Sequence, residues 1–237
     1  MKENTPFSKI FIVSAVLSIW LSAMLFGCNE HQTVAQKEIP NDKNMVAADN
    51  NWVAPDESTI PEGEAGDEIR YGKELIVHTA LYLGPKGKIA SISNGLNCQN
   101  CHMAAGTKPY ALNFSAVKST YPQVRNRPGK LVSIAERING CFDRSLNGQR
   151  LDTVGREIKA MIAYIEWVGN AVPMGVKPAD AGTIKLKYLD RAADPEKGKI
   201  AFATCQVCHG KDGQGQLNDK GTEYIFPPLW GPHSYND

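Results

Sequence analysis

Two Cys-x-x-Cys-His motifs place the strongest constraint on how this chain can fold. They span Cys98–His102 and Cys205–His209. In such a motif two thiols attach covalently to a haem, and the adjacent imidazole coordinates its iron. Cys-x-x-Cys pairs also bind zinc, but these pairs lie far apart and each is followed directly by His. The motifs therefore predict two c-type haems, one bound by Cys98, Cys101 and His102 and the other by Cys205, Cys208 and His209.

The N-terminus has the pattern of an export signal. Lys2 and Lys9 precede an apolar run that ends in Leu25-Phe26-Gly27-Cys28, which resembles a bacterial lipoprotein processing site. We expect residues 1–27 to be a lipoprotein signal peptide and Cys28 to become the lipidated first residue, tethered to a bacterial membrane. An uncleaved anchor helix and an ordinary signal peptide are the alternatives. Each of them places the body of the protein outside the cytoplasm, facing the periplasm or the cell exterior.

The cysteine count leaves one thiol without an assignment. Of six Cys, four belong to the haem motifs and Cys28 to the lipid, so only Cys141 remains. No pair is left for a disulfide, although the predicted compartment is oxidising. A single free thiol in that setting suggests a functional role for Cys141.

The charge distribution is uneven although the net charge is only +1. Residues 29–69 contain ten Asp or Glu against two Lys, whereas residues 84–150 contain ten Lys or Arg against two Asp or Glu. A basic domain favours a small anionic substrate or an acidic redox partner. A generally solvated surface explains the charge equally well. Nucleic acid is not an expected partner of an exported haem protein.

Local patterns predict helices around the motifs. Asp67 is a possible cap for a first helix, and a capping box at Ser133–Glu136 predicts a short helix that leads to Cys141. Apolar residues at helical spacing predict a longer helix over residues 152–167. Asp194 followed by Pro195 is a typical helix start before the second motif.

These patterns predict a mainly α fold with two class I cytochrome c domains in tandem. No closing helix and no Met follow His209, so we expect the second domain to be truncated at its C-terminus. The predicted organisation is a disordered tether at 28–65, domain 1 at 66–170, a linker at 171–193 and domain 2 at 194–237.

The sixth ligand of the first haem has several candidates. Met161 lies on the apolar stripe of the predicted long helix, which favours a core position. Met103 adjoins the proximal His102 and cannot reach the other face of the haem. His78 is either a distal ligand or a partly buried helix residue. Cys141 lies in the region that usually supplies distal ligands, although an inert buried thiol or an exposed spare thiol fits the sequence too.

The segment around Cys141 resembles a known family. Glu136–Gly148 is similar to the segment that carries the haem-ligating cysteine of dihaem thiosulfate dehydrogenases. Asn97–His102 with Ala105-Gly106, and Phe226–Gly231, also match, and the resemblance runs from about Ser58 to the end. The family couples two thiosulfates to tetrathionate with release of two electrons, and some members run the reaction backwards.

This resemblance implies roles for individual residues. Haem 1, on His102 and Cys141, would be the catalytic centre, with Cys141 as iron ligand or as the site of a sulfur adduct. Haem 2, on His209, would exchange electrons with a periplasmic or membrane partner. Arg137 and Arg144 lie four residues before and three after Cys141, so a helix puts all three on one side. They would bind substrate oxyanions or haem propionates, with Arg125 and Arg127 in the preceding loop as weaker candidates.

Three other functions remain compatible with the residues. The first is a non-catalytic electron carrier in which Cys141 is a structural ligand or a spare thiol. The second is a redox or gas sensor that signals by ligand loss at haem 1. The third is a dehydrogenase of another small anion, because a basic site selects charge more clearly than sulfur. His233, the only imidazole after His209, lies in a predicted loop and is not expected to be the native ligand of haem 2.

Overall fold

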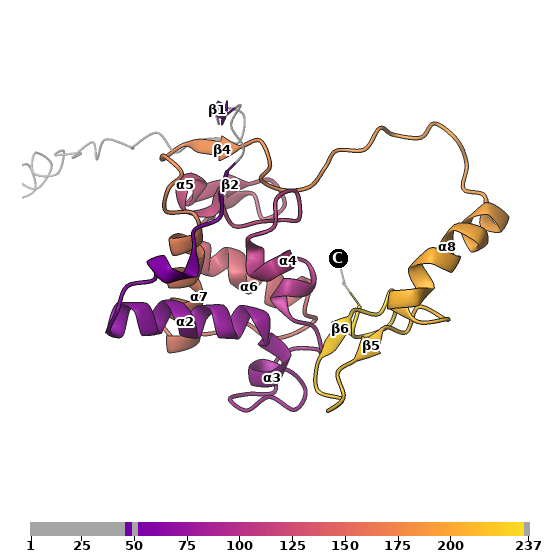
Figure 1. The fold of residues 1–237 in the computed structure, drawn as a ribbon, viewed down its shortest axis with the longest axis horizontal. Coiled ribbons are helices and arrows are strands. Elements are labelled where there is room, and N and C mark those ends of the chain that lie inside the picture. The colour runs from indigo at the N-terminus through magenta and orange to yellow at the C-terminus, as the bar shows by residue number, and fades with distance from the viewer. Residues whose placement is uncertain (1–45, 49–51, 235–237) are drawn as a thin grey trace, which may run out of the picture. The chain divides into compact units, whose positions relative to one another are not determined.

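The computed structural model describes residues 46–48 and 52–234, and the fold in this part is mostly helical (Figure 1). The predicted signal peptide, Cys28 and most of the predicted tether lie outside the described residues. No helix in the described part is long and apolar enough to cross a bilayer. The helices are η2 (Glu57–Thr59), α2 (Glu64–Val77), α3 (Thr79–Leu83), η3 (Cys98–Asn100), α4 (Met103–Gly106), α5 (Val117–Thr120), α6 (Ile134–Arg144), α7 (Arg156–Val168) and α8 (Pro195–His209).

Among the described residues, the strands form three short two-stranded sheets. Strands β1 (Val46–Ala48) and β4 (Val176–Pro178) are parallel. The pair β2 (Gln123–Arg125) and β3 (Lys130–Val132) is antiparallel, as is the pair β5 (Gln216–Leu217) and β6 (Tyr224–Phe226). The β2–β3 hairpin immediately precedes α6, so it positions the helix that carries Cys141.

Helices α2 and α7 pack against each other and form the centre of the core. Leu75 and Ile76 on α2 and Ile158 on α7 are at most 1% exposed. The crossing is close at Gly72, where an added Cβ would overlap the backbone carbonyl of Ala160. Burying each large aliphatic side chain contributes about 1.5–3 kcal/mol, so this apolar seam stabilises the fold that surrounds the first motif.

The long helix predicted over residues 152–167 is present as α7, but it begins later, at Arg156. The Asp152 side chain accepts a hydrogen bond from the Val154 backbone at 3.0 Å, and its carbonyl accepts one from Gly155 at 3.0 Å. This local turn delays the start of the helix. Met161 is 1% exposed within the core, as the apolar stripe predicts.

The prediction that Asp67 caps the first helix is wrong. Helix α2 begins at Glu64 after Gly63, whose φ of 81° is in the left-handed region that favours glycine. Asp67 therefore lies inside the first turn, where its carboxylate pairs with Arg70 at 3.2 Å. Because Gly63 caps the helix without a side-chain hydrogen bond, no polar residue in the sequence marks this helix start.

The end of the predicted tether differs from the expectation of disorder. Trp52 is 8% exposed and Ile60 is 6% exposed, so both side chains are buried. Between them Asp56 caps η2 by accepting a hydrogen bond from Ser58 at 2.9 Å. Burial of two large apolar side chains outweighs the polar composition of this stretch.

The predicted caps of α6, which carries Cys141, and of α8, which carries the second motif, are both confirmed. At α6, the Ser133 side chain accepts from the Glu136 backbone at 3.2 Å, and Glu136 accepts from the Ser133 backbone at 3.0 Å. At α8, Asp194 accepts from the Lys197 backbone at 3.1 Å, with Pro195 at the first helical position.

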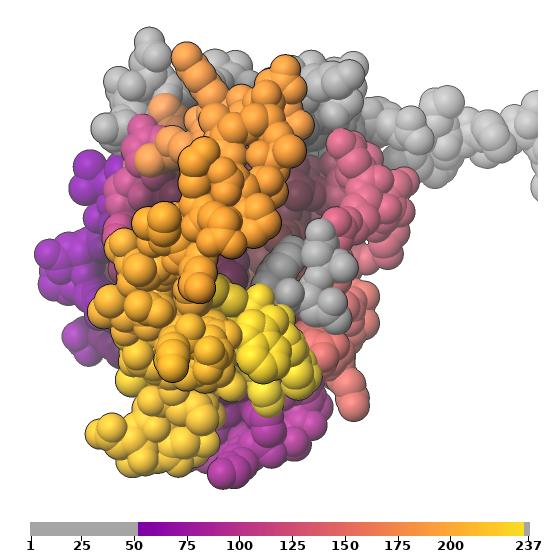
Figure 2. Space-filling view, turned by 90° about the vertical axis from the view of Figure 1, so that its right-hand side faces the viewer, coloured from indigo at the N-terminus to yellow at the C-terminus, as the bar shows by residue number. Residues whose placement is uncertain are grey.

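Helix α8 differs from α2 in burial. None of its residues is buried, and the residues of α8, β5 and β6 lie at the surface on the face shown in Figure 2, coloured orange to yellow. At Gly198 in α8, no described atom lies within 4 Å of an added Cβ, in contrast to Gly72 in α2. The tandem arrangement of two domains stays a prediction.

Candidate functional site

A cavity of about 420 Å³ brings the first haem motif and Cys141 together. We call it the Cys141 cavity. Cys98, Cys101 and His102 reach it from η3 and the residues that follow, and Cys141 reaches it from the third turn of α6. The volume lies in the range of about 300–1,000 Å³ that is typical of ligand sites. Its apolar walls include Ile76, Leu96, Phe114, Val117, Ile138, Phe142, Met161 and Ile165.

His102 is held in one orientation by a backbone carbonyl. Its Nδ1–H donates to the Leu112 carbonyl at 2.6 Å, which leaves Nε2 available to a metal. The carbonyl is itself fixed, because the Leu112 backbone donates to Gly182 at 2.8 Å. Burial lowers the pKa of His102, the Leu112 contact opposes this shift, and the charge of Arg137 adds to the lowering. The neutral imidazole that results is the form that coordinates iron.

The first motif is anchored to the end of α2 and the start of α3. The Cys98 backbone donates to the Thr79 hydroxyl at 3.0 Å, and Thr79 Oγ1 lies 3.2 Å from Cys98 Sγ. Asn97 Oδ1 accepts from the Ala80 backbone at 2.8 Å. Burial raises the pKa of the Cys98 thiol to about 12. Cys98 is therefore a neutral thiol in the protein without haem.

The residues of the Cys141 cavity fit a haem c. Two thiols at the motif spacing, an imidazole with its Nε2 available and apolar walls are the groups that such a cofactor requires. Cys141 and His102 line the same cavity, as the prediction of a shared iron requires.

The other candidates for the sixth ligand occupy different positions. His78 is directed toward Glu223, with Nδ1 3.2 Å from Oε1, and is absent from the described residues that line the cavity. Met161 lines the cavity while also packing in the core. Cys141 is half-buried, so its sulfur is accessible from the cavity.

Arg137 contacts Cys141 one helical turn away. Its Nη1 donates a hydrogen bond to Cys141 Sγ at 3.1 Å, as the four-residue spacing predicts. A guanidinium in this position stabilises negative charge on the sulfur. Tyr121 adjoins the pair: burial raises the pKa of its hydroxyl, whereas the charges of Arg125 and Arg137 oppose that shift.

A second cavity of about 460 Å³ lies between the β2–β3 hairpin and α6. We call it the basic cavity. Arg137 and Arg125 line both cavities, so the two are neighbours, whereas Arg144 lines only the basic one. Its two acids are paired, Glu136 with Lys130 at 2.9 Å and Asp143 with Arg150 at 3.0 Å. Positive charge therefore predominates, from Arg125, Arg127, Lys130, Arg137, Arg144 and Arg150.

The second motif repeats the orientation of the first imidazole. His209 Nδ1–H donates to the Pro227 carbonyl at 2.8 Å, which again leaves Nε2 available. Cys205 is exposed and Cys208 is half-buried. The donor set therefore fits a second haem c. The apolar segment Phe226–Trp230 follows the second motif in the chain. Its Trp230 side chain is held by a hydrogen bond from Nε1 to the Asp212 carbonyl at 2.7 Å.

Several site residues were not identified from the sequence. Thr79, Tyr121 and the carbonyls of Leu112 and Pro227 acquire their roles through tertiary contacts. Because every residue has a backbone carbonyl, the residue types Leu112 and Pro227 do not indicate these two roles. The pairing of each carbonyl with a motif His, ten and eighteen residues away, is visible only in the fold.

Comparison with known proteins gives a consistent result. The family model of the SoxA/TsdA cytochrome c domain matches residues 88–174. The chain is 42% identical to a thiosulfate dehydrogenase of Psychrobacter arcticus over 77% of its length and 54% of the relative's. It is 36% identical to the thiosulfate dehydrogenase of Allochromatium vinosum, over 77% of this chain and 67% of that protein.

A solved structure agrees with these matches. The thiosulfate dehydrogenase TsdBA from Marichromatium purpuratum superposes with a TM-score of 0.70 at 32% identity. The match covers 80% of this chain and 41% of that chain. This chain thus spans between about half and two thirds of the two curated relatives and less than half of the solved protein.

Proposed function

Because the chain belongs to the thiosulfate dehydrogenase family of c-type cytochromes, we propose that it interconverts thiosulfate and tetrathionate at the Cys141 cavity. The observation that carries this proposal is the contact between Arg137 Nη1 and Cys141 Sγ at 3.1 Å, in the cavity that also contains His102. A sulfur nucleophile beside a fixed cation, in a basic part of the chain, suits a small sulfur oxyanion.

We assign two haem c groups to the protein. Cys98, Cys101 and His102 would hold the first with Cys141 as its sixth ligand, and Cys205, Cys208 and His209 would hold the second. When bound, each haem supplies a one-electron acceptor or donor, so the pair accommodates the two electrons of the reaction. The two imidazoles, each fixed through Nδ1 by a carbonyl, support both assignments.

The reaction balances as two steps at Cys141. In the first, the Cys141 thiolate and the outer sulfur of one thiosulfate form an S–S bond, and two electrons leave to the one-electron acceptors. The product is Cys141–S–S–SO₃⁻. In the second, the outer sulfur of another thiosulfate attacks the sulfane sulfur. The Cys141–S bond breaks, and the thiolate and tetrathionate are released. The reverse sequence reduces tetrathionate.

The cations have separate tasks in this scheme. Arg137 stabilises the thiolate as it forms and as it leaves, because its guanidinium donates directly to Sγ. The basic cavity offsets the repulsion between two dianions that must approach one sulfur. Arg144 lines only the basic cavity, so we assign it to oxyanion or propionate binding rather than to the sulfur itself.

We further propose that the protein acts outside the cytoplasm, with a lipid on Cys28 that anchors it to a bacterial membrane. The second haem site would then exchange electrons with a periplasmic or membrane partner. The lysines, the apolar run and the terminal Gly27-Cys28 of the predicted signal peptide support the lipid anchor. The exposure of Cys205 supports access of a partner protein to the second haem site.

The test is to mix oxidised, full-length holoprotein with thiosulfate and follow haem reduction alongside tetrathionate formation. We expect one tetrathionate for each two electrons, and no tetrathionate from the Cys141→Ala variant with both haems attached. If neither mixing with thiosulfate nor mixing reduced protein with tetrathionate gives electron transfer, the protein is a carrier and the proposal is wrong.

A further inference from the structure

Strand β6 contacts the first haem motif directly. Asn100, between the attachment residues Cys98 and Cys101, donates through Nδ2 to the carbonyls of Tyr224 at 3.2 Å and Ile225 at 3.4 Å. Its Oδ1 accepts from the Asn97 backbone at 2.7 Å, which fixes the orientation of the amide. The side chain therefore joins the η3 turn to β6.

The same stretch of chain reaches the second motif. Pro227 follows β6 directly, and its carbonyl accepts the hydrogen bond from His209 at 2.8 Å. Asn100 donates to the Ile225 carbonyl, and the Pro227 carbonyl, which accepts from His209, lies only two residues further along the chain. Residues 224–227, which we call the β6 bridge, thus contact Asn100 of the first haem motif and His209 of the second.

Further contacts hold the β6 bridge in place. The Tyr224 backbone donates to the Gly95 carbonyl at 3.0 Å, and the Gly95 backbone donates to His233 Nδ1 at 3.1 Å. These contacts flank Asn100 on the side of the chain that precedes the motif. These backbone and side-chain hydrogen bonds together fix which residues of the β6 bridge lie beside residues 95–100.

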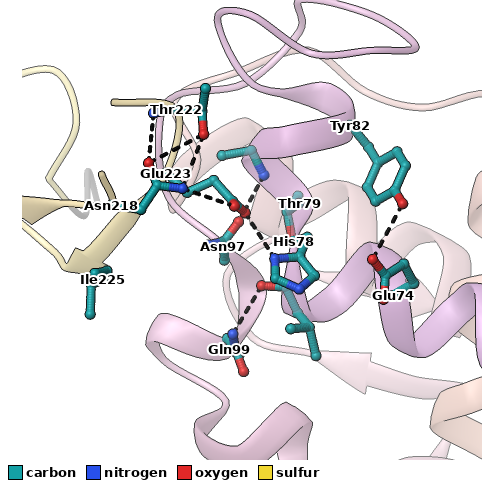
Figure 3. A network of polar contacts seen from close by, with 12 residues as sticks. Glu74, His78, Thr79, Tyr82, Asn97, Gln99, Asn218, Thr222, Glu223 and Ile225 are labelled. Atoms are coloured by element: carbon teal, nitrogen blue, oxygen red, sulfur yellow. Dashed lines mark hydrogen bonds and ion pairs between the residues drawn. The ribbon is translucent and has the colours of Figure 1, made fainter. Parts of the chain in front are cut away.

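Glu223, which directly precedes the β6 bridge, adds a polar anchor (Figure 3). Its Oε1 lies 3.2 Å from His78 Nδ1 at the end of α2, and its Oε2 accepts from Asn218 at 3.3 Å. Glu223 is only 8% exposed. A buried carboxylate is costly unless it is partnered, so a displaced bridge would leave Glu223 without the His78 contact that compensates its burial.

The Pro227 carbonyl connects this anchoring to iron chemistry. Hydrogen bonds to the second nitrogen of an axial histidine orient the ring, change its donor strength and thereby tune the metal. A shift of the β6 bridge against Asn100 changes the geometry of the Pro227–His209 bond. The coupling between two such sites is reciprocal, so the redox state of each site alters the other.

We propose that the β6 bridge couples the two haem sites, with Asn100 and Glu223 as positioning residues that set the second-site potential and the rate of electron exchange between the sites. This inference rests on the two haems of the proposed function. When bound, each haem would supply a one-electron donor or acceptor, so an exchange between the two sites would transfer one electron without a change of bond or proton. Neither residue touches the substrate sulfur in this account.

The test uses full-length holoprotein and three variants. Asn100→Asp keeps the acceptor for Asn97 but removes the donor to β6. Glu223→Ala removes the anchor without changing a residue of either motif, so it remains informative if the first variant attaches haem poorly. Gln99→Ala is the matched control: Gln99 lies in the same motif, but its side chain donates to the Val77 carbonyl at 3.0 Å instead of to β6.

Two readouts separate coupling from folding. A pulse of photogenerated one-electron reductant starts the exchange, which is followed at absorbance bands that distinguish the two haems, and a redox titration gives both potentials. We expect Asn100→Asp and Glu223→Ala each to slow exchange about tenfold or more and to shift the second potential. Gln99→Ala should change neither.

The outcomes are distinguishable from failure of the proposed function. If both variants keep two haems per chain, wild-type exchange rates and wild-type potentials, the coupling role is overturned while thiosulfate turnover stands. If the wild-type protein contains one haem or gives no electron transfer with thiosulfate or tetrathionate, the proposed function itself is overturned.

Discussion

Arg137 Nη1 lies 3.1 Å from Cys141 Sγ, one turn of α6 away. Both residues line the cavity that contains the first haem motif, and Arg137 also lines the basic cavity between the β2–β3 hairpin and α6. A single helix thus presents a sulfur nucleophile and the cation that stabilises it. Because the pair is local in sequence, its geometry depends mainly on where α6 begins.

Removal of the Arg137 guanidinium should impair turnover. A hydrogen bond to a charged group is worth about 1.5–3 kcal/mol, so Arg137→Ala should lower kcat/KM for thiosulfate by about 10- to 100-fold. Arg137→Lys should recover only part of this loss, because an ammonium lacks the planar fork. Arg144→Ala is the matched control from the same helix and should affect KM more than kcat. Equal activity of wild type and Arg137→Ala in steady-state assays would contradict this role.

The cap of α6 should contribute measurably to stability. Ser133→Ala removes one half of the capping box and should lower the free energy of unfolding by about 1 kcal/mol. Because α6 carries Cys141, the variant should also broaden the spectroscopic signature of the first site. Urea unfolding compared with wild type measures the loss. If the midpoint and slope of the urea unfolding curve were unchanged in Ser133→Ala, the cap would not contribute to the free energy of unfolding.

Acid should weaken the same cap. The Ser133 backbone hydrogen bond, and secondarily Lys130, hold the pKa of Glu136 below its ordinary value of 4.5. The folded state binds this proton less tightly than the unfolded state. The stabilisation is therefore fully present above about pH 4.5 and is lost as the pH falls through the folded pKa. Acid unfolding of Glu136→Gln should lack this component, whereas an identical pH dependence in both proteins would refute it.

Two helical glycines should respond oppositely to substitution. Gly72→Ala forces a methyl group into the Ala160 carbonyl and should destabilise the protein by about 1–3 kcal/mol. Gly198→Ala meets no described atom within 4 Å and should gain up to about 1 kcal/mol of helix propensity in α8. Thermal unfolding of the two variants measures both signs. Destabilisation by both substitutions to the same extent would contradict the different packing of α2 and α8.

The parts of the fold that local chemistry specifies could be predicted from the sequence. Ser133–Glu136 and Asp194-Pro195 carry the signals of their own caps, and the spacing of Arg137 and Cys141 implies their contact. The start of α2 was missed because Gly63 provides the cap through its backbone alone. The burial of Trp52 was missed because the polar residues around it dominate the composition.

The contacts that assemble the site could not be predicted from the sequence. Leu112 and Pro227 act through carbonyls, which every residue has, and the loop geometry alone selects them. Asn100 is an ordinary variable position of a haem motif until β6 lies beside it. Such roles depend on residues distant in sequence, and no periodicity or motif encodes them.

The most direct measurement of the central claim is a single turnover followed by peptide mapping. Oxidised holoprotein with two haems accepts two electrons, so one equivalent of thiosulfate should leave both haems reduced and one S–SO₃ group on Cys141. A second equivalent should release tetrathionate and restore the unmodified cysteine. Haem reduction and tetrathionate formation with Cys141 unmodified throughout would contradict the account.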